Sequence, residues 1–162
     1  MNIVKTLCLV AVAALAQACA AQEPALAIQG DVYHSACAPT ERHALLQQVA
    51  EAAAGRQEEA LATLVITALC GRDGKANEAV RQASVKSIKL TSTSTGSEKA
   101  VVTTVARTDL NAYAAAAWNA SVEANGSDVD VHFYKNEACI ETLTFKNLAK
   151  TWRLAAIAQA CD

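Results

Sequence analysis

Four cysteines are the residues of this 162-residue chain whose type and number point most directly to chemistry: Cys37, Cys70, Cys139 and Cys161. Two more, Cys8 and Cys19, fall in a leading segment that has the composition of an export signal. An even number of cysteines in an exported chain is typical of disulfides. A metal site is the alternative, but the chain has no Cys-x-x-Cys pair, and the spacing of His34 and His43 fits no helical ligand pair. We therefore expect two disulfides and no metal.

The first disulfide follows from a predicted helical hairpin. Residues 40–54 and 58–70 have the apolar spacing of helices, and only Gly-Arg-Gln joins them. A connection this short makes two helices antiparallel neighbours. Cys37 lies just before the first helix and Cys70 at the end of the second, so the hairpin brings them together.

The second disulfide follows from a predicted strand pair. Cys139 and Cys161 fall at the outer ends of the apparent strands 138–146 and 151–158, which a short turn connects. Antiparallel pairing of these strands brings the two cysteines to the same edge. In the chain-entropy model each of the two disulfides contributes about 3–4 kcal/mol.

The leading segment reads as a secretory signal. A weakly basic start is followed by an apolar run, residues 6–16, and then by small residues up to Glu23. This run is about half of the roughly 20 residues that a spanning helix needs. Cleavage after residue 21 would release the protein, whereas Ala-Gln-Ala before Cys19 resembles a bacterial lipoprotein box, which would remove residues 1–18 and leave Cys19 as a lipidation candidate. Both routes are open.

The length, the charge and the missing catalytic motifs of the chain limit the classes of function to be considered. Removal of the first 18 of 162 residues leaves 144, enough for one domain with a core, and a charge balance of 13 basic against 16 acidic residues. No stripe of Lys and Arg with interleaved aromatic residues is present, so we do not expect nucleic-acid binding. The chain contains no Gly-x-Ser-x-Gly, Gly-rich phosphate loop or His-Glu-x-x-His. Enzymatic activity is therefore uncertain and less favoured than binding, and no cofactor is expected.

The rest of the chain alternates between strand and helix patterns. Residues 22–38 read as a tether or irregular leading segment, and 39–162 as a single domain. Residues 84–94 and 100–107 are predicted to form a hairpin, whose Thr-, Ser- and Lys-rich side chains suit a solvated face or a polar protein-binding surface. Asp109 reads as the N-cap of a third helix that continues to Asn125.

Three strands complete the prediction, at residues 129–134, 138–145 and 152–158. The order α-α-β-β-α-β-β-β predicts an α+β fold with a mostly antiparallel sheet of about five strands. The helical segment EALATLVITALC, the hairpin KLTSTSTGSEKAVVTTVAR and the closing strand KTWRLAAI resemble the NTF2-like, or cystatin-like, superfamily. That resemblance covers most of the chain after the signal and implies helices packed in the hollow of a curved sheet.

The resemblance also implies a pocket between helices and sheet, and some members use Asp, His or Tyr there for acid–base work. The candidate lining residues in this chain are Tyr113, Trp118, Trp152, Asp109 and His132. Strand alternation, however, puts Val129, Val131 and Phe133 on the inner face and turns His132 and Tyr134 outward. Asp109 is better explained as a helix cap.

We therefore expect a small exported bacterial cell-envelope protein, in the periplasm or tethered through Cys19, that binds a protein partner or a small ligand without catalysis. An inhibitor or immunity-type protein is one role within this class. The alternative is an NTF2-like enzyme or small-molecule carrier with a pocket between helices and sheet.

Overall fold

The computed structural model describes residues 34–71, 73–96, 99–110 and 117–162. The signal-like segment and Cys19 are outside these ranges, so the predictions made for residues 1–33 lie outside the described part. None of the described helices is long and apolar enough to cross a lipid bilayer.

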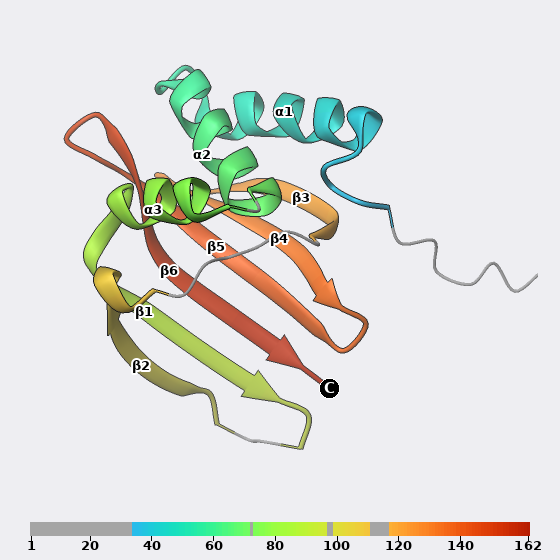
Figure 1. Cartoon of the computed structure of the whole chain (residues 1–162), viewed down its shortest axis with the longest axis vertical. Helices are drawn as coiled ribbons and strands as arrows, with labels where there is room; N and C mark the ends of the chain where they lie inside the picture. The colour runs from blue at the N-terminus through green and yellow to red at the C-terminus, as the bar shows by residue number, and fades with distance from the viewer. Residues whose placement is uncertain (1–33, 72, 97–98, 111–116) are drawn as a thin grey trace, which may run out of the picture. The chain divides into compact units, whose positions relative to one another are not determined.

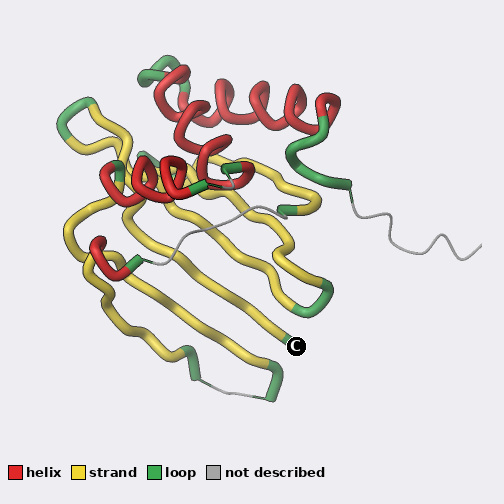
Figure 2. Tube along the Cα trace, viewed as in Figure 1, coloured by secondary structure: helices red, strands yellow, loops and turns green. Residues whose placement is uncertain are grey.

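The described residues form an α+β fold, with three α-helices packed against one six-stranded sheet (Figure 1). The helices are α1 (Pro39–Ala53), α2 (Glu58–Cys70) and α3 (Gly74–Gln82). The strands are β1 (Ser84–Ser94), β2 (Val101–Ala106), β3 (Trp118–Asn125), β4 (Asp128–Asn136), β5 (Cys139–Leu148) and β6 (Thr151–Cys161). A short 3-10 helix, η1 (Arg107–Asp109), follows β2. Figure 2 shows the helices gathered toward one end of the sheet, while the strands continue beyond them.

The strands are ordered β2-β1-β6-β5-β4-β3. Neighbouring strands run antiparallel except β1 and β6, which are parallel. The mostly antiparallel α+β class is therefore confirmed, although the sheet has six strands where about five were expected. The parallel pair forms because the last strand inserts between the N-terminal hairpin β1–β2 and the C-terminal meander.

Local signals explain the helix boundaries. Pro39 stands in the first turn of α1, where its missing N–H costs no hydrogen bond, and Ala54, the residue after the helix, takes the left-handed conformation. The side chain of Asp73 caps α3 by accepting a hydrogen bond of 2.7 Å from the backbone N–H of Ala76. α3 is an additional helix between α2 and β1, where the predicted element order has none.

The predicted third helix, from Asp109 to Asn125, is wrong over its second half. Residues 118–125 form β3, which pairs antiparallel with β4. Residues 111–116 lie outside the described part. Asp109 is the last residue of η1, with its carboxylate 3.2 Å from the Thr108 hydroxyl that donates to it. The helix prediction fails for residues 118–125 because strand pairing with β4 outweighs the local helical preference of this segment.

The core lies between the helices and one face of the sheet. Large side chains that are fully buried come from both layers, and include Leu45, Leu61 and Leu69 of the helices and Ile88, Leu143, Phe145 and Leu154 of the sheet. Val129, Val131 and Phe133 are also buried, which confirms the inner face predicted for β4. We call this face the inner face and the opposite one the outer face.

Both disulfides are present with the expected pairing. Cys37 is bonded to Cys70, and Cys139 to Cys161, with Cα–Cα distances of 5.7 and 4.2 Å. The first ties the segment before α1 to the end of α2, and buried Ala36 shows that this segment already belongs to the folded domain. Two disulfides indicate that the chain folds in an oxidising compartment outside the cytoplasm.

Candidate functional site

The candidate pocket residues do not converge on one site. Trp152 is buried at the start of β6, where its indole N–H donates to the carbonyl of Arg56. Trp118 begins β3 and pairs with Tyr134 of β4. Tyr134 pairs with Ile140 of β5, which in turn pairs with Ala160 of β6. At about 3.3 Å per residue, the distance along β6 from Ala160 to Trp152 is more than 20 Å. The two tryptophans therefore lie toward opposite ends of the sheet, and Tyr113 is outside the described residues.

The acid–base candidates also lie apart. Asp109 is exposed in η1. His132 faces outward, as the alternation predicted, with Nδ1 2.9 Å from the Thr142 hydroxyl and Nε2 3.0 Å from the Glu123 carboxylate. Both partners are neighbours on the outer face of the sheet, so His132 belongs to a cross-strand polar network there. Among the described residues, no group of three or more His, Cys, Asp or Glu side chains could hold a metal ion.

Two carboxylates of the described residues are buried with one oxygen that lacks a hydrogen-bond partner: Asp130 on the outer face and Glu141 on the inner face. Glu141 is 3% exposed and stands on β5 in the same alternating row as Leu143 and Phe145. Its Oε1 accepts from Lys135 Nζ at 3.1 Å, whereas its Oε2 is buried and has no hydrogen-bond partner among the residues that the structure describes. An unsatisfied buried acceptor costs about 1–3 kcal/mol, so a native structure that retains one calls for an explanation.

Glu141 lines a cavity of about 190 Å³ on the inner face, which we call the Glu141 hollow. The other side chains that matter here come from β1, β2 and β6: Leu90, Ser92, Val101, Thr103, Ile157 and Gln159. The strand register explains why they meet, since Leu90 pairs with both Ile157 and Thr103, and Glu141 pairs with Gln159. The hollow thus combines apolar walls with hydroxyl and amide groups and one carboxylate oxygen that lacks a partner.

Sequence reasoning missed Glu141, although a signal was present. In the segment Cys-Ile-Glu-Thr-Leu-Thr-Phe, strict alternation places Glu141 on the face of Leu143 and Phe145. A charged residue in an otherwise apolar row predicts either a break in the strand or a buried carboxylate. The strand continues without a break at Glu141, and its carboxylate is buried.

A larger groove lies between α2, α3 and the start of β6. Its volume is about 540 Å³, and Leu64, Ala79, Ala83 and Trp152 supply apolar walls. Its polar side chains are largely satisfied internally: Thr63 and Thr67 each donate to a carbonyl one turn earlier in α2, and Gln57 accepts from Asn147 at 2.9 Å. This groove can therefore make apolar contacts with a ligand but has few polar groups left to form hydrogen bonds with it.

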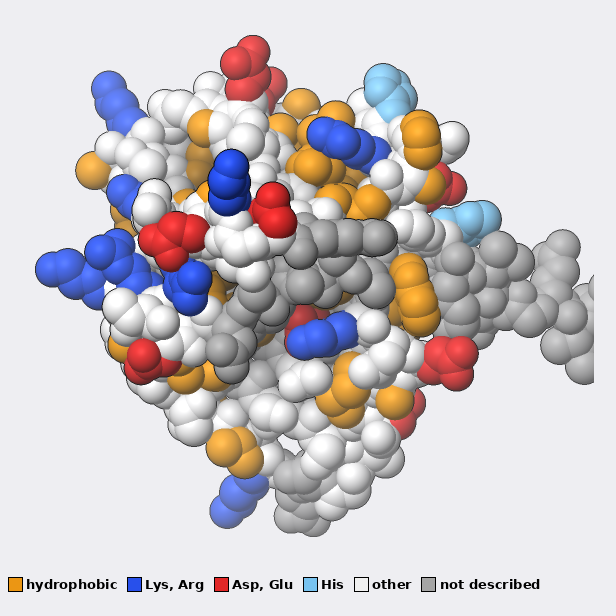
Figure 3. All heavy atoms as spheres, viewed as in Figure 1, with side chains coloured by type: hydrophobic (Ala, Val, Ile, Leu, Met, Phe, Trp, Pro, Cys, Tyr) orange, Lys and Arg blue, Asp and Glu red, His pale blue; other side chains and the backbone are white. Residues whose placement is uncertain are grey.

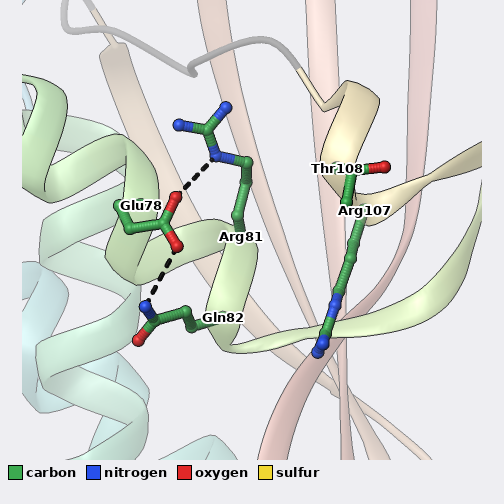
Figure 4. Close-up of a pocket in the computed structure, with 5 residues that line it drawn as sticks. All are labelled: Glu78, Arg81, Gln82, Arg107 and Thr108. Atoms are coloured by element: carbon green, nitrogen blue, oxygen red, sulfur yellow. Dashed lines mark hydrogen bonds and ion pairs between the residues drawn. The ribbon is translucent and has the colours of Figure 1, made fainter.

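A third hollow, of about 330 Å³, lies between α3 and η1 and contains two arginines (Figure 4). Arg81 is already paired with Glu78, whose other oxygen accepts from Gln82. Figure 4 shows the side chain of Arg107 extending away from Glu78 and Arg81 rather than toward a shared centre. The two guanidinium groups therefore do not form an anion cradle.

Charged side chains on the face seen in Figure 3 are interspersed, with acidic and basic groups near one another. On the sheet, the cross-strand ion pair of Lys146 with Asp128, at 3.1 Å, follows the same pattern. Of the hollows described, the Glu141 hollow is thus the one whose lining includes a buried polar atom without a partner.

The chain matches no protein-family model and has no significant match among curated protein sequences.

Proposed function

We propose that this protein is a small, exported, non-catalytic binding protein of the bacterial cell envelope, and that its ligand occupies the Glu141 hollow. The observation that carries the proposal is Glu141 Oε2, a buried acceptor in the lining of a cavity with no partner in the described part of the chain. A ligand that donates a hydrogen bond to this oxygen would remove the cost of leaving it unsatisfied. The disulfides support the extracytoplasmic location; the periplasm, with or without a lipid on Cys19, is the compartment we propose.

The lining defines the ligand class. Lys135 already lies 3.1 Å from the other oxygen of Glu141, so the pair offers one acceptor position rather than a full uncompensated charge. Leu90, Val101 and Ile157 provide apolar contact. The proposed ligand is therefore a small hydroxyl, amide or amine with an apolar body, either free or as the side chain of a partner protein. An inhibitor or immunity-type role would correspond to the second form.

The test is a titration followed by amide NMR, with four probes of equal chain length: butanol, butyramide, butylammonium and butyrate. The three donors should shift the amide signals of residues 90–92 and 157–159. Butyrate should not, because its carboxylate would face that of Glu141. Glu141→Leu should abolish the response to the donors, while Asp130→Asn should keep it, because Asp130 is a buried carboxylate on the outer face. Equal responses from all four probes, or an unchanged response in Glu141→Leu, would refute the proposal.

An NTF2-like enzyme or carrier is the second candidate, and the same residue favours it. A buried carboxylate in a hollow is a candidate general base, because proton transfer needs a group within hydrogen-bond reach of the substrate. Asp109 and His132, the acid–base residues expected from the sequence, are not in its lining. Recovery of a bound ligand chemically unchanged after long incubation supports the binding protein. Conversion that Glu141→Gln prevents supports the enzyme.

A further inference from the structure

The two edge strands of the sheet, β3 and β2, differ in how far other residues of the domain cover their outer backbone groups. The β3 edge is covered: residues 34–36 run along it, with the Ala36 N–H donating to the Ala117 carbonyl and the Asn119 N–H to the His34 carbonyl, each at 2.9 Å. Farther along the same strand, Gln48 of α1 accepts from the backbone N–H of Val122 at 2.8 Å. This edge strand therefore has several of its outward backbone groups satisfied.

The β2 edge has no such cover from the residues that the structure describes. Among the described strands, β2 pairs with β1 alone, and its sequence Val-Val-Thr-Thr-Val-Ala contains no charge and no proline. Val101 and Val102 are 62% and 56% exposed. Proteins normally protect an edge strand with lysine, proline, a bulge or a covering segment. An uncharged edge without a covering segment, beside a covered one, is open to pairing with a further strand.

We propose that β2 is the docking edge for a second copy of this chain, which pairs β2 with β2 across a two-fold axis and continues the sheet from one protomer into the next. A two-fold axis perpendicular to the sheet makes the strands antiparallel and sets one residue opposite itself. With Thr103 at that position, Val101 faces Val105 of the second copy and Val102 faces Thr104. Every pair from 101 to 105 is then β-branched on both sides.

The composition of β2 favours a copy of itself over other occupants. β-branched residues opposite one another are favourable cross-strand pairs, and like charges opposite one another are unfavourable. Because β2 carries no charge, self-pairing meets no repulsion within the strand. Placing Thr104 on the axis instead would set Val101 opposite Arg107 and Val102 opposite Ala106, with fewer β-branched pairs. The Thr103 register is therefore the one we infer.

This pairing has a consequence for the inner face. Val101 and Thr103 line the Glu141 hollow. In the proposed dimer they would lie beside Val105 and Thr103 of the second copy, on the same face of the continued sheet, so the two hollows would adjoin at the axis. The proposal goes beyond the ligand-binding function and stands without it, because the edge pattern does not depend on Glu141.

The first test measures mass against concentration by sedimentation equilibrium on the full mature chain. The mass should rise from one chain to two, and no further, because the two-fold contact is closed. Val102→Lys should lower the association constant about tenfold or more, since it places a charge in the paired edge. Leu148→Lys is the matched control, because Leu148 is 47% exposed but lies on β5. Circular dichroism checks that both variants are folded.

The second test fixes the register by disulfide trapping. Opposite residues of an antiparallel pair have Cα atoms roughly 4.5–5.5 Å apart, which a disulfide can span. Thr103→Cys should cross-link to its own copy under mild oxidation, whereas Val101→Cys, which faces Val105, should not. A single-chain mass at every concentration, a mass beyond two chains, an unchanged association constant in Val102→Lys, or equal cross-linking of the two cysteine variants would each overturn the proposal. None of these outcomes bears on ligand binding to Glu141, so the two proposals fail separately.

Discussion

The guanidinium of Arg56 lies over the ring of Trp152, 5.2 Å from its centroid, while the indole N–H of Trp152 donates to the carbonyl of Arg56. The same guanidinium donates to the carbonyls of Ala53 at 2.9 Å and Ser127 at 2.7 Å. One side chain in the α1–α2 connection thus joins the end of α1, the β3–β4 turn and the start of β6. It fixes how the helical hairpin sits on the sheet.

Arg56→Lys should lower the free energy of unfolding by about 2 kcal/mol, because a lysine ammonium cannot reproduce the planar set of donors that reaches several carbonyls. Urea unfolding followed by Trp fluorescence measures the change. Arg81→Lys is the control: its pair with Glu78 is exposed, and we expect a loss below about 0.5 kcal/mol. Equal losses in the two variants would contradict this role for Arg56.

Gly71 is predicted to be intolerant of any side chain. A Cβ at this position would lie 2.6 Å from the carbonyl oxygen of Thr67 and against the Cβ of Ala76. Gly71→Ala should therefore destabilise the domain by about 1–3 kcal/mol through overpacking. Gly74→Ala, at the first residue of α3, meets no atom within 4 Å and should stay within about 0.5 kcal/mol of the wild type. Thermal unfolding of the two variants makes the comparison.

Removing either disulfide should cost about 3–4 kcal/mol, given closed loops of 33 and 22 residues. The paired variants are Cys37→Ala with Cys70→Ala, and Cys139→Ala with Cys161→Ala. The first pair should also speed hydrogen exchange of the Ala36 amide, because Cys37 anchors the segment that covers β3. A thiol titration of the denatured, unreduced protein should find no free thiol at these four positions, and detection of four would contradict both bonds.

Glu141→Leu should leave the free energy of unfolding unchanged or raise it by about 1 kcal/mol. The substitution removes a buried oxygen without a partner, and Lys135, which is 49% exposed, can turn to solvent. Stability would thus rise as the proposed site is lost, which is the usual relationship at functional residues. A destabilisation above about 1 kcal/mol, measured by urea unfolding, would instead assign Glu141 a structural role.

Gln48→Ala should uncover the protected sheet edge. Loss of the side-chain acceptor leaves the Val122 N–H to water, so its hydrogen exchange should accelerate while the domain loses about 1 kcal/mol. Gln47→Ala is the matched control on the exposed side of α1. Unchanged exchange at Val122 in Gln48→Ala would show that the bond contributes little to edge protection.

Elements whose bounds depend on residues close together in the chain were predicted well. The second helix begins at Glu58 and ends at Cys70 as expected, because acidic residues favour its first turn and the following Gly71 ends it. The first strand, Ser84–Ser94, also has the predicted bounds, since β-branched residues are dense there. The segment WNASVEAN carries a weak local preference, and its strand forms only because β4 offers a pairing edge.

The candidate site was the least predictable part. Trp118 and Trp152 were both expected in one pocket, but the strand register places them toward opposite ends of the sheet. The spacing of residues along the chain does not predict this register. Glu141 was visible as a charge in an apolar row, but whether its second oxygen would find a partner depends on atoms from three other strands.

The sequence by itself determined the α+β class, the helical hairpin, the inner face of β4 and the pairing of the four cysteines. These features depend on the spacing of apolar residues, on short connections between elements and on strand alternation, all of which involve residues close together in the chain. Only the tertiary structure decided that β6 inserts beside β1, that no described segment covers the β2 edge and that Glu141 keeps one oxygen without a partner among the described residues. Those outcomes depend on which distant segments compete for the same backbone hydrogen bonds and buried space, and that competition is settled only when the whole sheet assembles.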